Sequence, residues 1–127
     1  MSILGHGIDL VECERVAKVL GNHRDRFLDR VLTPAERELA ARHRNPVPFI
    51  SGRWAAKEAI LKMIGTGWRG QITWNDIEIL PDALGQPMAA LTGETKRIAD
   101  GMGIVRVMLS ITHTEHYAAA SAIGVGP

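Results

Sequence analysis

Side chains that could bind a metal ion and a phosphate occur at three separated positions. Asp9 follows a short apolar segment near the N-terminus, whereas Glu58 lies in a helical segment with Lys62 four residues later. Two carboxylates from separate elements can share one Mg²⁺, which prefers oxygen ligands and takes the rest from water and substrate phosphate. Lys62 adds a cation that suits a phosphorylated ligand. Spacing alone does not distinguish Asp9 and Glu58 from any other distant acidic pair.

Two further groups of residues allow more than one interpretation. His113, Glu115 and His116 could bind zinc, but their spacing is not a specific zinc pattern and no distant further ligand is evident. Gly65-Thr66-Gly67 could offer backbone N–H groups to a phosphate, although such a segment is more often a helix cap. Cys13 is the only cysteine, which excludes a disulfide framework and a thiolate metal site; we expect it in the core.

The segment Ser51–Gly67, which carries Glu58 and Lys62, has the pattern of an unusual helix. At roughly 100° per residue, Arg53 and Lys57 flank one edge of its apolar side, and the acidic–basic pair flanks the other. This pattern predicts a helix wedged between two packing partners, with a charged pair at each edge. The apolar side itself is formed by Ala55, Ala56, Ala59, Ile60, Met63 and Ile64.

The remaining periodicities predict an α+β domain with a mainly antiparallel sheet and helices packed on one face. Thr33-Pro34-Ala35-Glu36 is a helix start with a capping box, in which Thr33 is the N-cap. We expect a single domain of residues 1–127. Its expected strands are 2–8, 71–80, 88–91, 104–112 and 117–125, and its expected further helices are 12–20, 33–43 and 92–100.

Composition excludes several classes of protein. The 127 residues carry a net charge of +1, which argues against a general nucleic-acid binder and against disorder. No apolar run approaches the length of a membrane span, and the N-terminus lacks the features of a signal peptide, so we expect a cytoplasmic protein. The segment from Arg15 to Arg30 is locally basic, which would suit an acidic protein partner.

Five motifs together resemble one known family. They stand in the same order as in the bacterial holo-acyl-carrier-protein synthases, the small 4′-phosphopantetheinyl transferases of fatty acid biosynthesis. The resemblance covers nearly the whole chain, and its most specific part is WAAKEAILK between GID and SITH. The motifs are GIDLVECERV (7–16), RFLDRVLTPAE (26–36), GRWAAKEAILKMIGTG (52–67), DIEIL…GQP (76–87) and LSITHTEHYAAASAI (109–123).

The resemblance implies an activity and a metal site. The family transfers 4′-phosphopantetheine from coenzyme A to a serine of apo-acyl carrier protein, and adenosine 3′,5′-bisphosphate leaves. Asp9 and Glu58 match the family's Mg²⁺ ligands, and Lys62 matches a position that binds phosphate. By this resemblance the catalytic residues are Glu58, Lys62 and Asp9.

The resemblance also implies binding surfaces and an assembly. Arg15, Arg26 and Phe27 match the surface that meets the acidic helix of acyl carrier protein. The family forms homotrimers with sites between subunits, which agrees with the two polar edges of the central helix. Trp54 stands where the family commonly has Phe, so we expect a local change in packing. The positions that match the coenzyme A cleft are Arg53, Lys57, Gly65, Thr66, Gly67, Pro87, Thr112 and His113.

Three other functions are compatible with parts of the pattern. A coenzyme A or carrier-protein binding module could have lost activity, but the joint presence of Asp9, Glu58 and Lys62 argues against this. A metal-dependent phosphohydrolase would use water as the nucleophile and need no protein acceptor. A purely structural trimer would leave the match of these three residues unexplained.

Overall fold

The computed structural model describes residues 1–67 and 70–127, which form four α-helices and two antiparallel sheets. The predicted α+β class with antiparallel pairing is therefore confirmed, although the sheet is divided into two. The elements are β1 (Ile3–Glu12), α1 (Cys13–Val31), α2 (Pro34–Ala41), α3 (Val47–Ile64), η1 (Trp74–Asp76), β2 (Ile77–Pro81), β3 (Pro87–Leu91), α4 (Gly93–Gly101), β4 (Arg106–His113) and β5 (Tyr117–Val125).

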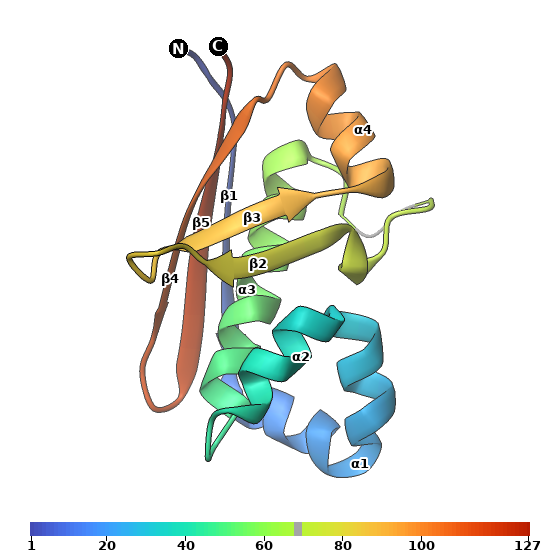
Figure 1. The fold of residues 1–127 in the computed structure, drawn as a ribbon, viewed down its shortest axis with the longest axis vertical. Helices are drawn as coiled ribbons and strands as arrows, with labels where there is room; N and C mark the ends of the chain where they lie inside the picture. The colour runs from blue at the N-terminus through green and yellow to red at the C-terminus, as the bar shows by residue number, and fades with distance from the viewer. Residues whose placement is uncertain (68–69) are drawn as a thin grey trace.

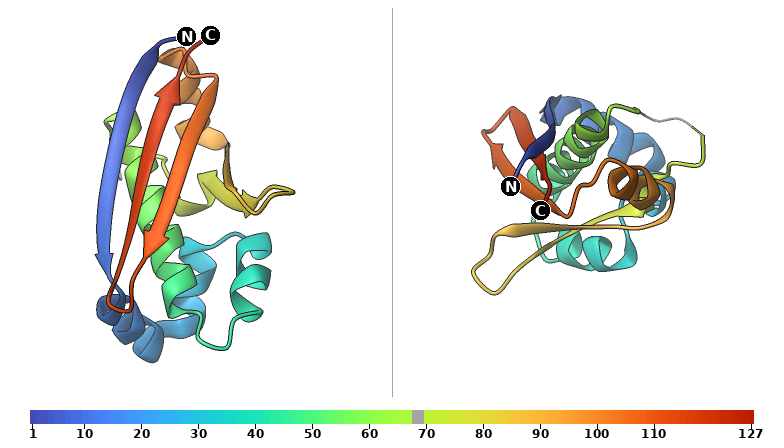
Figure 2. Two further views of the ribbon diagram at one scale, coloured as in Figure 1. Left: turned by 90° about the vertical axis from the view of Figure 1, so that its left-hand side faces the viewer. Right: turned by 90° about the horizontal axis from the view of Figure 1, so that it is seen from above.

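The central helix α3 lies along one face of the three-stranded sheet, whose strand order is β1-β5-β4 (Figure 1). Helices α1 and α2 pack at one end of α3, and α4 lies at the other end. The hairpin β2–β3 is a separate two-stranded sheet, whose strand β3 lies near β4 of the central sheet (Figure 2). Helix α3 thus packs against the sheet, other helices and the hairpin, as its two polar edges predicted.

The backbones of β1 and α3 approach each other unusually closely. A Cβ atom at Gly7 would lie 1.9 Å from the carbonyl oxygen of Ala59, and one at Gly5 would lie 2.3 Å from that of Met63. Such distances are far below van der Waals contact, so only glycine fits at either position. The glycines therefore allow the strand and the helix to bring their functional side chains together.

Several expected elements differ at their ends from those observed. Strand β1 continues beyond the expected 2–8 to Glu12, and α3 begins at Val47, before the expected Ser51. Gly21 does not end the first helix, because α1 continues across a kink at His23 to bury Leu28 and Val31. The expected strand 71–80 begins only at Ile77, and the residues before it form the 3₁₀ turn η1. There the side chain of Asp76 accepts from the backbone N–H of Thr73, a local cap that competes with an extended backbone.

The sheet face that α3 does not cover carries several large apolar side chains. Ile8 and Leu10 alternate with Asp9 along β1, and they are 61% and 65% exposed. Met108 of β4 is also exposed. Large apolar side chains gathered on one exposed face are typical of a protein interface. Within residues 1–67 and 70–127, no helix is sufficiently long and apolar to span a membrane.

Candidate active site

Asp9, Glu58 and Lys62 come together at the contact of β1 with α3. Strand alternation turns Asp9 toward α3, where Asp9 and Glu58 line one cavity of about 190 Å³. Nζ of Lys62 donates to Oδ1 of Asp9 at 3.1 Å and to the carbonyl oxygen of Ile8 at 3.0 Å. The structure thus unites a strand residue with two helix residues that the sequence separates by about fifty positions.

The two carboxylates fit a hard divalent cation. Both line one small cavity and could offer it oxygen ligands, and Mg²⁺ usually takes only one or two carboxylates from the protein. The side chain of Lys62 is 53% exposed, so its ammonium group can turn from Asp9 toward a bound phosphate. By contrast, no three His, Cys, Asp or Glu side chains gather among the described residues, which disfavours the zinc interpretation of His113, Glu115 and His116.

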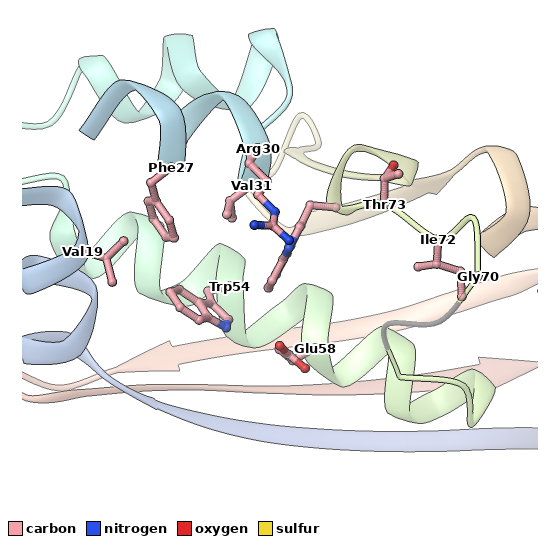
Figure 3. Close-up of a pocket in the computed structure, with 10 residues that line it drawn as sticks. Val19, Phe27, Arg30, Val31, Trp54, Glu58, Gly70, Ile72 and Thr73 are labelled. Atoms are coloured by element: carbon pink, nitrogen blue, oxygen red, sulfur yellow. The ribbon is translucent and has the colours of Figure 1, made fainter. Parts of the chain in front are cut away.

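A larger cavity of about 680 Å³ opens beside Glu58 and has an aromatic wall (Figure 3). The ring of Trp54 lies 5.4 Å from that of Phe27 and 5.7 Å from that of Trp74, between centroids. The sequence did not predict this cavity, because its wall combines α1, α3 and residues 70–74. An extended, largely apolar ligand chain would fit it in size and chemistry.

Lys57, which is predicted to belong to the coenzyme A cleft, is not accessible to a ligand in this structure. Its side chain is fully buried and forms an ion pair with Glu36, which is also fully buried, at 2.7 Å. Burial lowers the pKa of Lys57, and the adjacent carboxylate of Glu36 opposes this effect. Packing of α2 and β2 over this edge of α3 closes it to solvent, so no ligand can reach the ammonium group.

Arg53, Pro87 and His113 line a second cavity, of about 420 Å³. The guanidinium of Arg53 stacks over Phe49 at 4.3 Å, and its buried Nε has no hydrogen-bond partner among the described residues. Burial lowers the pKa of Arg53, and Glu36 opposes this effect. A buried donor without a partner is costly, and an anionic group of a ligand would satisfy it.

The expected coenzyme A residues do not form one cleft within a single chain. The cavity of Arg53 shares no lining residue with the cavities beside Glu58. Thr112 and His113 are adjacent in β4, so their side chains point to opposite faces of the sheet. Gly65 is the left-handed C-cap of α3, as the helix-cap interpretation of Gly65-Thr66-Gly67 predicted; its contact with phosphate stays a prediction.

The three residues expected to meet a carrier protein lie on α1 beside the site. Arg15 lines the small cavity and lies over the ring of Trp54, 5.9 Å from its centroid. Arg26 is exposed, and Phe27 is partly buried in the wall of the aromatic cavity. A partner that binds α1 would therefore approach the carboxylates.

Comparisons with known proteins agree on one family. Residues 5–120 match the model of the 4′-phosphopantetheinyl transferase superfamily. A holo-[acyl-carrier-protein] synthase of Koribacter versatilis is 46% identical over 121 residues, which cover 95% of this chain and 97% of the relative.

Solved structures agree with this match. The holo-[acyl-carrier-protein] synthase of Neisseria meningitidis has a TM-score of 0.89 at 33% identity, and the match covers 98% of this chain and 99% of the other. The synthase of Bacillus anthracis, solved in complex with CoA (3′,5′-ADP), has a TM-score of 0.82 at 33% identity and 98% coverage of both chains.

Proposed function

Because the chain belongs to the holo-[acyl-carrier-protein] synthase family of 4′-phosphopantetheinyl transferases, we propose that it modifies an apo-acyl carrier protein. The serine hydroxyl oxygen of the carrier attacks the phosphorus that bears the pantetheine arm of coenzyme A. The phosphoanhydride bond breaks, and adenosine 3′,5′-bisphosphate leaves. The observation that carries this proposal is the convergence of Asp9, Glu58 and Lys62 on one small cavity. We place the reaction in the cytoplasm, in fatty acid biosynthesis.

Asp9 and Glu58 are the residues that would hold Mg²⁺. When bound, the ion would neutralise negative charge on the pyrophosphate. Lys62 would place its ammonium group on the leaving phosphate, since its side chain is half exposed and reaches Asp9 at the edge of the cavity. The serine proton would pass to Glu58, directly or through water.

We further propose that the active assembly is a homotrimer with each site between two subunits. The support is that one chain carries two separated half-sites, one with Asp9 and Glu58 and the other with Arg53 and His113. In a ring, the first half-site of one subunit can face the second of its neighbour. The exposed apolar face of the central sheet offers a surface for such contacts.

The first experiment is an intact-mass assay with the protein, coenzyme A, Mg²⁺ and an apo-acyl carrier protein. The expected result is a gain of one phosphopantetheine on the carrier, which a chelator abolishes and added Mg²⁺ restores. The physical reason is that a single ammonium group leaves most of the pyrophosphate charge unscreened when the cation is removed.

Other outcomes of this assay distinguish the alternative functions. Coenzyme A binding without transfer to several carriers would indicate an inactive binding module. Cleavage of coenzyme A without any carrier would indicate a phosphohydrolase. Transfer that persists in chelator would contradict the role given to Asp9 and Glu58.

The proposed carrier-binding surface gives a separate prediction. Replacing Arg15 and Arg26 by Glu should raise the KM for the carrier about tenfold or more, because attraction to an acidic helix becomes repulsion. Steady-state kinetics at two salt concentrations would measure this change, and the salt dependence of the KM should become weaker. The coenzyme A affinity of the single variant Arg26→Glu should not change, because Arg26, unlike Arg15, does not line the cavity of the two carboxylates.

A matched charge reversal tests whether location matters. Lys96→Glu together with Arg97→Glu introduces the same charge change on α4, at the other end of α3 from α1 (Figure 1). The KM for the carrier should stay close to its original value in this variant. Equal effects of the α1 and α4 reversals would mean that net charge, and not a surface on α1, controls binding.

A further inference from the structure

Lys57 and Glu36 form a completely paired ionic group beneath the candidate active site. Nζ of Lys57 donates to Oε1 of Glu36 at 2.7 Å, to the carbonyl oxygen of Val31 at 2.7 Å and to that of Trp74 at 3.2 Å. An ammonium group has three N–H donors, so each donor has one acceptor. Both side chains are fully buried, and neither can contact a substrate.

Glu36 extends this connection to further elements. Its Oε1 also accepts from the backbone N–H of Thr33, and its Oε2 accepts from the backbone N–H of Ile79, both at 2.8 Å. The pair therefore connects α3 with α1, α2, η1 and β2. Few other contacts of α3 in the described chain are directional, because most of its buried side chains are apolar.

The pair lies on the opposite side of α3 from β1. At roughly 100° per residue, Lys57 is about 160° around the helix from Ala59, whose carbonyl oxygen faces Gly7. On the β1 side, the directional contacts that the described residues show for α3 come from the half-exposed side chain of Lys62, which donates to Asp9 and to a backbone carbonyl oxygen of β1. The close approach of the alanine and glycine backbones mainly constrains the distance between helix and strand. The rotation needs a second, directional contact, and Lys57 provides one.

We propose that Lys57 and Glu36 are positioning residues that fix the rotation of α3 and thereby the separation of Glu58 from Asp9. Lys57 and Glu58 are neighbours, so a rotation of α3 moves both side chains together. A rotation of about 20° moves the end of a side chain about 5–6 Å from the helix axis by about 2 Å. A set of metal-binding side chains functions only when its atoms are held within about 0.5 Å and 10–20° of the productive geometry. The inference rests on the proposed metal role of Asp9 and Glu58.

The hydrogen bond to Trp74 adds a second effect. It holds the backbone of η1 against α3 and so places Trp74 at 5.7 Å from Trp54, in the wall of the aromatic cavity beside Glu58. The same ammonium group thus positions both the metal ligand and the cavity next to it. A pair serving only stability could lie anywhere in the core, whereas this one adjoins Glu58 in sequence and space.

The test separates positioning from stability by measuring metal binding. Lys57→Met alone leaves a buried carboxylate unpaired, so the main variant is the double change Glu36→Gln with Lys57→Met, which removes both charges. Circular dichroism measures folding and Tm. Electron paramagnetic resonance measures Mn²⁺ binding in the presence of coenzyme A. We expect a folded variant whose Mn²⁺ affinity is at least tenfold weaker.

The controls make every outcome decisive. Ala99→Gly lowers stability through a buried position of α4 outside the network and should leave Mn²⁺ affinity unchanged. If the methionine variant does not fold, Glu36→Gln with Lys57→Gln, in which two amides can pair, takes its place. Unchanged Mn²⁺ affinity in a folded double variant overturns the positioning role.

The measurement is independent of phosphopantetheine transfer. If the wild-type protein binds Mn²⁺ but modifies no carrier, the proposed function fails while the positioning role is still tested. If the wild-type protein binds no Mn²⁺, the positioning role is overturned together with the metal site.

Discussion

Replacing Glu58 by glutamine is expected to lower kcat/KM for phosphopantetheine transfer by about 10²–10³-fold, with little change in Tm. The variant keeps the shape of the side chain but loses the charge that would hold Mg²⁺ against the pyrophosphate. The partly exposed position of Glu58, at the edge of two cavities, means that the substitution removes no core packing. Intact-mass kinetics at several Mg²⁺ concentrations would measure the loss.

Two related variants show whether the metal site is responsible. Asp9→Asn should give a loss of similar size, since it removes the other carboxylate of the same cavity. Glu38→Gln makes the same chemical change on the exposed surface of α2 and should keep normal turnover. Normal turnover of Glu58→Gln with Mg²⁺ present would eliminate the metal assignment.

Two inactive variants are expected to restore activity when they assemble together. Glu58→Gln damages one half-site and Arg53→Ala damages the other, and in the proposed trimer each active site takes one half from each of two subunits. With random mixing at equal amounts, about one quarter of the sites combine two intact halves. Co-expression with two affinity tags, followed by the transfer assay, would measure this recovery.

A second mixture serves as the matched control. Glu58→Gln mixed with Asp9→Asn damages the same half-site in every subunit, so no combination of these chains restores a site. Light scattering establishes the assembly in parallel. A monomer at working concentration, or mixed trimers of Glu58→Gln and Arg53→Ala without recovery, would contradict the proposal of shared sites.

Local patterns in the sequence predicted much of this fold. The capping box at Thr33 and Glu36, the helix around Glu58 and the final strand Tyr117–Val125 follow from short-range preferences and are confirmed. These preferences depend on neighbouring residues only, so one sequence suffices to detect them. The pairing of β1 with β5 joins the two ends of the chain and has no local signal.

Local patterns could not predict whether an individual charged side chain is buried or exposed. Lys57 and Lys62 both flank the apolar side of the same helix, yet one is fully buried and the other is half exposed. The difference arises from α2 and the β2–β3 hairpin, which cover only one edge of α3 (Figure 1). Helical periodicity gives the direction in which a side chain projects from the helix axis, but not which element packs against that side.

The pairing of β1 with β5 has a consequence for synthesis on the ribosome. Asp9 lies opposite Ala120 in this ladder, and Ile3 lies opposite Val125. A nascent chain therefore carries its first strand unpaired until residues 117–125 emerge from the exit tunnel. Contacts across such a sequence separation form slowly, after the helices between them. The wall that carries Asp9 is therefore expected to be among the last features of the fold to form.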